Sequence, residues 1–407
     1  MKKHLYLMLL WLLPFGMSSA QNFDEYFADS TLRIDYTLAG SHSRQSVFLD
    51  KLNRFPGWAG RRNHLGELPL QGNGQLYVRT LNDRRIIYCH SFSSLFQEWI
   101  ETEEAYKTER SFEHCMLIPF PKQPVEVEIC LRNNKRETVC RLKHIIDPSD
   151  ILIQRIGEEH VTPYKVMLEA DDPDHCIDIA FLAEGYTRRE LKTFYRDVRT
   201  GIESLFQHVP FRSEKGRFRI VAVASTSLQS GISVPRLSLW KHTAFSSHFS
   251  TFYSDRYLTT LHIKDVHDAL AGIPYEHIII LANTGEYGGG GIYNSYNLTA
   301  AHHPNYRPVV VHEFGHSFAG LADEYYYDAH DANDQTYSLD VEPWEPNITT
   351  KHDPEKAVAI GRTEGGGYRA KGIWRYQKDC RMRTNEYPEF CPVCQQSILR
   401  IIRLYPE

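Results

Sequence analysis

The chain of 407 residues lacks a second long apolar run, an internal repeat and any low-complexity tract. A membrane-spanning helix needs ~20 consecutive apolar residues. After the first 15 residues no apolar run approaches that length, so we expect no membrane-spanning segment beyond the N-terminus. With 42% hydrophobic and 24% charged residues, the composition is that of an ordinary globular protein.

The sequence also lacks long runs of one charge sign. Its formal net charge is −5 at pH 7, and acidic and basic residues are mixed along the chain. Proteins that bind nucleic acids usually concentrate Lys and Arg in a patch or stripe. We therefore expect no nucleic acid partner.

The N-terminus has the pattern of a secretory signal peptide. Lys2 and Lys3 supply the basic start, residues 5–15 form a short apolar segment, and residues 18–20 are the small residues of a cleavage site. The apolar segment is shorter than the ~20 residues of a retained anchor. The next residue is Gln21, not a cysteine that could carry a lipid. We expect a cleaved signal peptide over residues 1–20 and a secreted or periplasmic protein without stable membrane insertion.

The motif HEFGH is the most informative part of the chain. His312 and His316 are four residues apart, so on a helix their imidazoles project from one face and reach a single Zn²⁺. Glu313 would then act as a general base on a zinc-bound water. Pro308 suits the first turn of such a helix, and Gly320 suits its end. The alternative is a buried helix whose histidines only hydrogen-bond to backbone or water, and the motif favours the zinc site over it.

A catalytic zinc site of this kind needs a third protein ligand. Gly320 allows the chain to turn sharply after the helix, which would bring Asp323 back toward the metal. Two alternatives stay open: Glu324, the next residue of the same turn, and a glutamate on a separate helix. We favour Asp323 because the glycine turn gives it a physical route to the zinc.

The stretch HEFGHSFAGLADEYYY resembles the signature HExGHxxxGLxDEY of the secreted bacterial metallopeptidases founded on an immunoglobulin A peptidase. The supporting segments are Trp374 and residues 179–186, 380–383 and 390–394, and the start of the chain resembles the N-terminal domain that often precedes this peptidase unit. The resemblance implies a metzincin-like fold, bound Zn²⁺ and endopeptidase activity on protein or peptide substrates. In the usual metzincin spacing the glycine and the acid come one residue earlier than they do here. Immunoglobulin A does not follow as the substrate, because a fold and a site do not fix a physiological target.

The C-terminal segment adds further candidates. In metzincins a methionine turn lies beneath the zinc histidines, and the resemblance makes Met382 its counterpart, with Tyr387 as a candidate phenol donor. Cys380, Cys391 and Cys394 cluster in the same segment. In an exported protein a disulfide among them would brace the site. Because only one CxxC is present, the sequence does not indicate a structural zinc with four thiolates.

The expected fold class is α+β with two domains. Residues 21–156 show short alternating strands separated by polar turns, which is typical of a β-sandwich, and they contain no catalytic constellation. We expect this domain to serve mainly as a structural spacer. The clearest strands are a hairpin of residues 77–80 with 85–89, and the alternating segments 125–129 and 137–142.

Residues 157–407 are expected to form a metzincin-like α/β zinc peptidase domain. Segments 178–183, 218–224 and 277–282 are apolar enough for buried strands, and helices are expected over 188–207 and 258–271. The glycine run 288–291 precedes Ile292, Tyr293 and Asn294. Because glycine allows a close backbone approach, this run is either a sheet edge that pairs with an extended peptide substrate or a flexible loop.

Together these features predict a secreted zinc-dependent endopeptidase that hydrolyses peptide bonds through a Glu-activated zinc-bound water. Two other functions are compatible with the motif: a zinc hydrolase acting on glycoconjugate or cell-wall material, and a catalytically silent binding protein on a peptidase scaffold. The presence of Glu313 beside both histidines argues against the silent protein. The glycine-rich edge, which suits an extended peptide backbone, argues against the other hydrolase.

Overall fold

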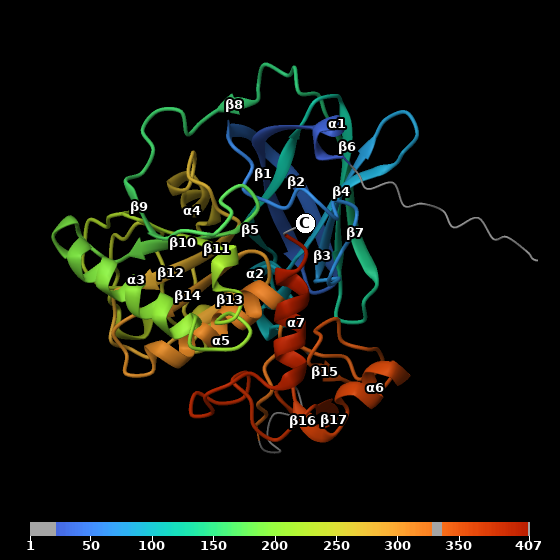
Figure 1. Ribbon diagram of the computed structural model, residues 1–407. Helices are drawn as coiled ribbons and strands as arrows, with labels where there is room; N and C mark the ends of the chain where they lie inside the picture. Colours follow the sequence, from blue (N-terminus) through green and yellow to red (C-terminus); the bar gives the residue numbers. More distant parts are fainter. Residues whose placement is uncertain (1–21, 328–335, 406–407) are drawn as a thin grey trace, which may run out of the picture.

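A computed structural model of the protein describes residues 22–327 and 336–405, and Figure 1 shows how its elements are arranged. The predicted signal peptide, residues 1–20, lies outside the described residues. The chain has a mixed α+β fold built on several sheets, as expected for the fold class. Within the described part of the chain, no helix has the length and apolar character needed to cross a membrane.

The N-terminal part consists of two four-stranded sheets that share one hydrophobic core. The first sheet has the order β5-β1-β2-β8, and its strands are β1 (Phe27–Ser41), β2 (Arg44–Pro56), β5 (Arg110–Pro121) and β8 (Gln154–Arg155). The second has the order β4-β3-β6-β7, with β3 (Gly74–Thr80), β4 (Ile86–Phe92), β6 (Val125–Arg132) and β7 (Thr138–Ile146). Short helices α1 (Phe23–Tyr26), α2 (Leu95–Trp99) and η1 (Glu103–Tyr106) accompany them.

The alternating segments read from the sequence coincide with the second sheet. The predicted hairpin is β3 with β4, and the two further segments are β6 and β7. The long antiparallel pair of β1 and β2 was not predicted from the sequence. Most residues of β1 are buried on both faces, so the strand lacks the alternation that marks a half-buried strand.

A six-stranded sheet forms the centre of the C-terminal part. Its order is β13-β14-β12-β10-β11-β9, with β9 (Tyr164–Leu168), β10 (Ile177–Glu184), β11 (Phe218–Val223), β12 (His277–Ala282), β13 (Gly289–Ile292) and β14 (Tyr296–Ala300). The four inner strands are parallel, and the two edge strands β9 and β13 run antiparallel to their neighbours. The three apolar segments predicted as buried strands are β10, β11 and β12.

Both faces of this sheet are covered. Ile179 and Phe181 of β10 pack into a core with helices α3 (Leu191–Leu205), α5 (Tyr306–Ala319) and α7 (Pro392–Ile402). Ala180 and Leu182, which point to the opposite face, pack into the core that the N-terminal sheets share with α4 (Ile263–Ala269). The N-terminal sheets are therefore part of the support of the central sheet.

The predicted helix over 258–271 is wrong in its first part, because α4 begins only at Ile263. Thr259 instead forms a β-bridge with His248, and the hydroxyl of Thr260 donates a hydrogen bond to the carbonyl of Phe245. These long-range partners hold residues 258–260 in an extended conformation that the local apolar pattern did not reveal. The other predicted helix, over 188–207, is present as η2 (Arg188–Glu190) followed directly by α3.

The chain between the first and second predicted domains leaves one sheet and enters another. The strand β8 adds to the first N-terminal sheet, and β9 is an edge of the central sheet. The predicted boundary at 156/157 lies in this connection, where Gly157 packs directly against Gly272.

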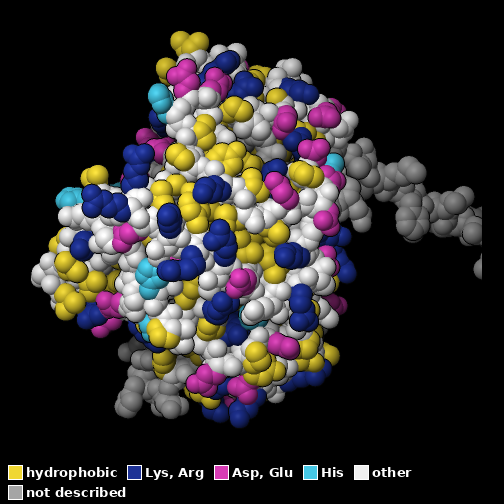
Figure 2. All heavy atoms as spheres, turned by 60° about the vertical axis from the view of Figure 1, so that its left-hand side comes forward, with side chains coloured by type: hydrophobic (Ala, Val, Ile, Leu, Met, Phe, Trp, Pro, Cys, Tyr) yellow, Lys and Arg dark blue, Asp and Glu magenta, His cyan; other side chains and the backbone are white. Residues whose placement is uncertain are grey.

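On the face that Figure 2 shows, Lys and Arg side chains lie among hydrophobic and acidic ones.

A small three-stranded sheet follows the HEFGH helix. Its order is β15-β17-β16, with β15 (Ile348–Thr349), β16 (Thr363–Gly366) and β17 (Arg369–Arg375), and α6 (Pro354–Ile360) lies between β15 and β16. Figure 1 shows this sheet at the bottom of the view near the lower end of α7. It positions residues next to the end of α5, as described below. The remaining short helices are η3 (Lys215–Arg217), η4 (Pro235–Leu237) and η5 (Thr251–Tyr253).

Candidate metal centre

Helix α5 carries the HEFGH motif and ends where the sequence predicted. Pro308 lies in its first turn, and Gly320 is its C-cap in the left-handed conformation with φ of 58°. The N–H of Leu321 donates to the carbonyl of Gly315 at 3.2 Å, which closes the end of the helix. The chain then reverses direction, and the residues after Gly320 return toward the face of α5 that carries the histidines.

This turn brings three ligand atoms together. Nε2 of His312 and Nε2 of His316 are 3.1 Å apart, and Oδ1 of Asp323 lies 3.0 Å from the first and 3.3 Å from the second. Two ligands held ~2.1 Å from a zinc ion in tetrahedral geometry are about 3.4 Å apart. The three atoms therefore have nearly the spacing of three corners of a zinc coordination sphere. Oδ1 of Asp323 is also a buried acceptor that receives no hydrogen bond, as expected of an atom that faces a cation.

The backbone fixes the orientation of both imidazoles. Nδ1 of His312 lies 3.0 Å from the carbonyl oxygen of Arg381, and Nδ1 of His316 contacts the carbonyl oxygen of Leu321. When Nδ1 donates its proton to a carbonyl, Nε2 is left with a free lone pair directed at the metal. The position of each carbonyl beside Nδ1 therefore favours the tautomer that a zinc ligand needs.

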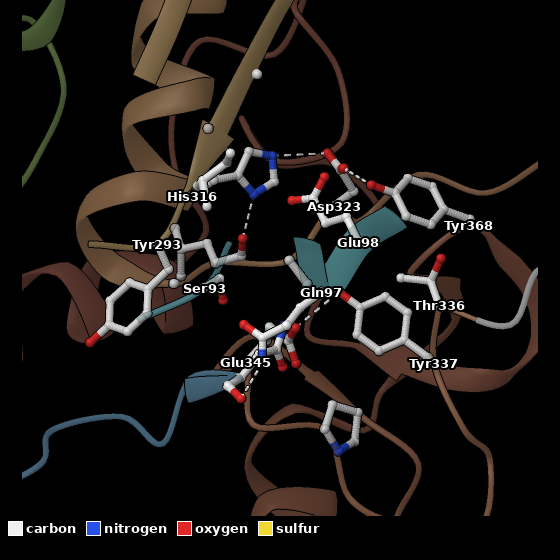
Figure 3. A pocket seen from close by; sticks show the side chains of 18 of the residues that line it. Ser93, Gln97, Glu98, Tyr293, His316, Asp323, Thr336, Tyr337, Glu345 and Tyr368 are labelled. Atoms are coloured by element: carbon white, nitrogen blue, oxygen red, sulfur yellow. Dashed lines mark hydrogen bonds and ion pairs between the residues drawn. The ribbon is translucent and has the colours of Figure 1, made fainter. Parts of the chain in front are cut away.

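Asp323 and its neighbour point in opposite directions. The hydroxyl of Tyr368 donates to Oδ2 of Asp323 at 2.6 Å, and the N–H of Gly367 donates to the carbonyl of Asp323 at 2.8 Å. Figure 3 shows Asp323 between His316 and Tyr368. The carboxylate of Glu324 instead accepts a hydrogen bond from Asn347 at 3.0 Å, away from the histidines. Of the three candidates for the third ligand, the structure brings only Asp323 into contact with both histidines.

Glu313 lies on helix α5, on the side that packs against the edge strand β13. A Cβ atom on Gly289 would lie 2.9 Å from Oε1 of Glu313, and one on Gly291 would lie 2.2 Å from its carbonyl oxygen. The glycine run is therefore required for the close approach of the strand to the helix. Burial raises the pKa of Glu313, as does the nearby Asp323, while His312 and His316 oppose the increase. A carboxylate with a raised pKa is a better proton acceptor than an exposed one.

A cavity of about 670 Å³ opens over this group. It is lined by the three candidate ligands, Glu313, residues 289–291 of the edge strand and tyrosines 257, 325, 337 and 368. The N-terminal sheets and their connections also contribute, through Ser93, Gln97, Glu98, Arg132 and Arg136 among others. The N-terminal part is thus more than the spacer expected from its sequence, because it forms part of the cavity wall.

The glycine run is a sheet edge for part of its predicted length. The strand β13 covers Gly289–Ile292 and is an edge of the central sheet, where it pairs with β14. On its other side Gly289 forms a parallel β-bridge with Tyr257, and among the described residues no strand pairs with Gly290–Ile292 there. Tyr293 and Asn294 were expected to continue the edge, but they form the turn into β14, where Asn294 has φ of 49°. The N–H of Asn294 donates to Ser317 on α5, which fixes this turn on the helix.

Met382 packs beneath the histidines. It is fully buried, and its sulfur lies 2.8 Å from the position of a Cβ on Gly315, which stands between His312 and His316 in the helix. Gly315 thus leaves room for the methionine. The carbonyl of Met382 also accepts the N–H of Glu324 at 2.8 Å, which joins this turn to the segment that carries Asp323. Tyr387 does not line the cavity.

Two residues of the cavity, Tyr368 and Glu98, were not identified from the sequence. Tyr368 follows Asp323 by 45 residues and reaches it only because β16 and β17 fold back over the site. Glu98 comes from helix α2 and contacts the hydroxyl of Tyr257 inside the cavity. Burial raises the pKa of Glu98 to about 7, and the hydrogen bond from Tyr257 opposes the increase. Neither residue stands near the motif in the chain, so no local signal could have indicated it.

A helix that presents two histidines and a glutamate to a cleft, with an aspartate returned by a glycine turn, is the arrangement of metal-dependent hydrolases. The comparison with known families agrees. The family described as IgA Peptidase M64 matches residues 166–359 and 352–402, and the one described as Peptidase M64 N-terminus matches residues 22–143. The chain belongs to the IgA peptidase M64 family, which confirms the resemblance and places it among metallopeptidases that act on proteins. No curated protein matches the sequence.

Proposed function

We propose that the chain is a secreted zinc-dependent endopeptidase, with His312, His316 and Asp323 as the zinc ligands and Glu313 as the general base. The observation that carries the proposal is the triangle of two Nε2 atoms and one carboxylate oxygen with edges of 3.0, 3.1 and 3.3 Å. Two imidazoles and one carboxylate are a common ligand set of catalytic zinc sites, in which the fourth position stays open. The secretion part of the proposal rests on the signal-peptide pattern of residues 1–20.

Zinc bound at this site would polarise the scissile carbonyl and make the attacking water more acidic. Glu313 would accept a proton from that water as it attacks the carbonyl carbon, and would then pass the proton to the leaving amine nitrogen. Its carboxylate is suited to both steps because it lies against Gly289 of the edge strand β13, and burial raises its pKa. Tyr368 would hold Asp323 in place through its hydrogen bond to Oδ2.

The edge strand β13 supports a peptide as the substrate, because beyond the bridge of Gly289 to Tyr257 no strand of the described chain pairs with residues 290–292 on the side away from β14. An extended chain can add to such an edge through backbone hydrogen bonds, with alternate side chains directed into the cavity and away from it. The edge passes within contact distance of Glu313, so a peptide bound there would place a carbonyl close to the base and the ligand triangle. A glycoconjugate would make no comparable use of backbone pairing.

The proposal is tested by incubating the purified mature protein with a mixed peptide library, with and without a chelator. We expect cleavage that the chelator abolishes and that added Zn²⁺ restores. Replacing the base in Glu313→Gln should lower turnover by at least ~100-fold, because general-base catalysis typically contributes 10²- to 10⁴-fold. The amide is close in size to the carboxylate, so the variant should keep its zinc.

Two outcomes would contradict the proposal. Cleavage of cell-wall or glycoconjugate material with no peptide hydrolysis would favour the other hydrolase. Zinc binding without hydrolysis of any library member, equal in wild type and Glu313→Gln, would favour a binding protein on a peptidase scaffold. Near-wild-type turnover by Glu313→Gln with normal zinc content would exclude Glu313 as the base.

A further inference from the structure

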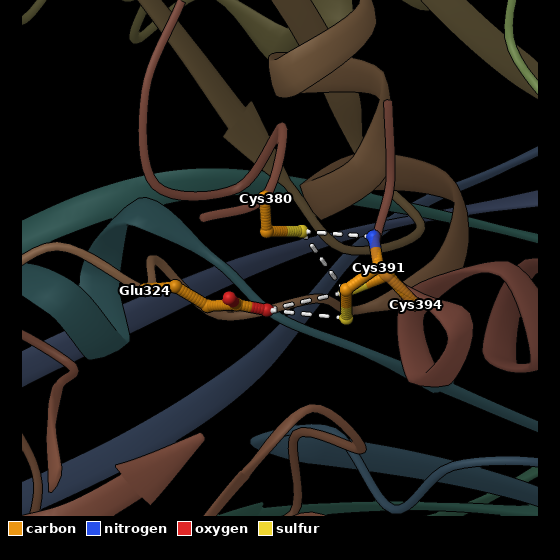
Figure 4. A group of neighbouring side chains, drawn as sticks. All are labelled: Glu324, Cys380, Cys391 and Cys394. Carbon is orange, nitrogen blue, oxygen red and sulfur yellow. Dashed lines mark hydrogen bonds between the residues drawn. The ribbon is translucent and has the colours of Figure 1, made fainter. Parts of the chain in front are cut away.

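A second group of metal-ligating side chains lies beside the segment that carries Asp323. Cys380, Cys391, Cys394 and Glu324 each place one ligand atom so that all four atoms lie within 4.8 Å of one another. All four residues are buried. Figure 4 shows the carboxylate of Glu324 directed at the sulfurs of Cys391 and Cys394, with Cys380 close by. None of these residues takes part in the proposed hydrolysis, and we call the group the thiolate cluster.

The distances within the thiolate cluster match a tetrahedral site. The sulfur of Cys394 lies 3.5 Å from that of Cys391 and 3.8 Å from that of Cys380. Oε1 of Glu324 lies 3.2 Å from the sulfur of Cys394 and 3.9 Å from that of Cys391. With zinc–sulfur bonds of ~2.3 Å and zinc–oxygen bonds of ~2.1 Å, a tetrahedron has sulfur–sulfur edges of about 3.8 Å and sulfur–oxygen edges of about 3.6 Å. One cation could therefore contact all four atoms with only small adjustments.

The backbone around the cluster favours the anionic form of the cysteines. Cys391 is the N-cap of the 11-residue helix α7, and Cys394 lies in its first turn, where the helix dipole stabilises negative charge. Cys380 accepts N–H donors from Cys391 at 3.2 Å and from Met382 at 3.5 Å. Thiolates and not thiols are the metal ligands, so the two donors at Cys380 and the helix N-terminus at Cys391 and Cys394 favour the form that binds a cation.

Glu324 supplies the strongest independent indication. The residue is fully buried, and Oε2 of its carboxylate is a buried atom without a hydrogen-bond partner. Its other oxygen accepts a hydrogen bond from the side-chain amide of Asn347 at 3.0 Å, the one N–H donor to it in the described part of the chain. A buried carboxylate is costly unless it is paired with a charge or coordinates a metal. A cation among the three sulfurs would satisfy this requirement.

A disulfide explains the cluster less well. All eight cysteines of the chain are free in the structure. Three cysteines cannot all be paired with one another, so a disulfide between any two would leave one thiol and the carboxylate of Glu324 without a cationic partner. The cluster directs four metal-ligand atoms, three sulfurs and one oxygen, at one point. This is the composition of a structural metal site whose positions are all filled by protein ligands, and not of a redox pair of cysteines.

We propose that Cys380, Cys391, Cys394 and Glu324 bind a second, structural zinc ion. Thiolate ligands select zinc over harder divalent cations, and four protein ligands leave no position open for a substrate. The ion would join three segments: the one that carries Asp323, the turn that carries Met382, and helix α7. Because Glu324 directly follows Asp323, the second ion would fix the position of the third ligand of the catalytic centre.

The experiment uses the full mature chain, purified with zinc and dialysed without a chelator. Elemental analysis should find two zinc ions per wild-type chain. The variant His312→Ala should retain one, bound at the thiolate cluster, and Cys394→Ser should lose the cluster ion. The matched control is Cys140→Ser, which removes a half-buried cysteine of β7 far from the cluster and should keep both ions.

Cobalt substitution identifies the site of each ion without relying on activity. Co²⁺ bound to thiolates gives intense charge-transfer absorption in the near ultraviolet, whereas Co²⁺ bound to histidine and carboxylate does not. We expect this absorption in the wild type and in His312→Ala. We expect a shift of this absorption in Glu324→Gln, where the three thiolates remain, and its loss in the double variant Cys391→Ser with Cys394→Ser.

The wild-type protein alone can overturn the proposal, so misfolding of a variant does not protect it. After chelation and denaturation without reductant, all eight cysteines should react with a thiol reagent. Two fewer reactive thiols, together with a single zinc ion per wild-type chain, would show a disulfide in place of the metal. Failure of the proposed peptidase is a separate result, because the cluster absorption and the second zinc do not depend on hydrolysis.

Discussion

The hydroxyl of Tyr368 donates a 2.6 Å hydrogen bond to Oδ2 of Asp323, and Oδ1 of the same carboxylate faces Nε2 of His312 at 3.0 Å. Each oxygen of the carboxylate therefore has its own task. One is held by a phenol from the small C-terminal sheet, and the other is left for a cation. Outer hydrogen bonds of this kind orient a metal ligand and tune its basicity.

Replacing this phenol tests its role. Tyr368→Phe removes only the hydroxyl, so Asp323 should lose its anchor while the ring packing remains. We expect zinc affinity or turnover to fall by ~10- to 100-fold, the usual cost of losing such an outer partner. Chelator competition measures the affinity and peptide hydrolysis the turnover. Tyr387→Phe, which changes a tyrosine outside the cavity, is the control and should behave as wild type.

Asp323→Ala should release the zinc of the histidine site. Asp323 supplies one of three expected protein ligands and the only negative charge among them, so its loss leaves an incomplete coordination sphere. The affinity is measured by competition against a chelator of known strength. Glu324→Gln should weaken this site far less, because its carboxylate points to Asn347 and the cysteines. Release of this zinc by Glu324→Gln while Asp323→Ala holds it would exclude Asp323 as the third ligand.

Gly291→Ala should destabilise the protein and lower activity. The added methyl group would lie 2.2 Å from the carbonyl oxygen of Glu313 and 2.9 Å from Cβ of His316, so strand β13 must move away from α5. Overpacking of this kind typically costs about 1–3 kcal/mol of unfolding free energy. Urea denaturation measures the loss. Gly285→Ala is the matched control, because the nearest atom to its added methyl is 3.9 Å away. Equal stability of the two variants would show that the close approach is not required.

Glu276→Gln should change the dependence of stability on pH. Burial and the nearby Asp178 raise the pKa of Glu276 in the folded protein well above 4.5, while a hydrogen bond from Tyr405 opposes the increase. The folded state then binds more protons than the unfolded state as pH rises above 4.5, so ionisation of this residue reduces wild-type stability over that range.

The variant cannot ionise at this position and should gain stability relative to the wild type as the pH rises from about 4.5. The gain amounts to ~1.4 kcal/mol for each unit by which the folded pKa exceeds the unfolded value. Urea unfolding at a series of pH values gives the difference in free energy. Glu103→Gln, which alters an exposed glutamate, should show no such trend. A difference between Glu276→Gln and wild type that is independent of pH would contradict the raised pKa.

Local spacing was sufficient for the core of the candidate centre. Two histidines four residues apart lie on one face of any helix, and Gly320 can adopt the positive φ that ends it, so α5 and the return of Asp323 followed from the sequence. The buried strands β10, β11 and β12 were also predictable, because continuous apolar segments of this length are typical of parallel strands covered on both faces.

Tertiary structure alone decided the rest. Tyr368, Glu98 and the wall formed by the N-terminal sheets reach the cavity through contacts between segments distant in the chain. The same holds for residues 258–260, where a bridge to His248 prevents the expected start of a helix. Cys391 and Cys394 form a single CxxC in the sequence, but folding adds Cys380 and Glu324 to them. Sequence spacing determines which side chains share the face of one element, whereas packing between elements determines which of those faces meet.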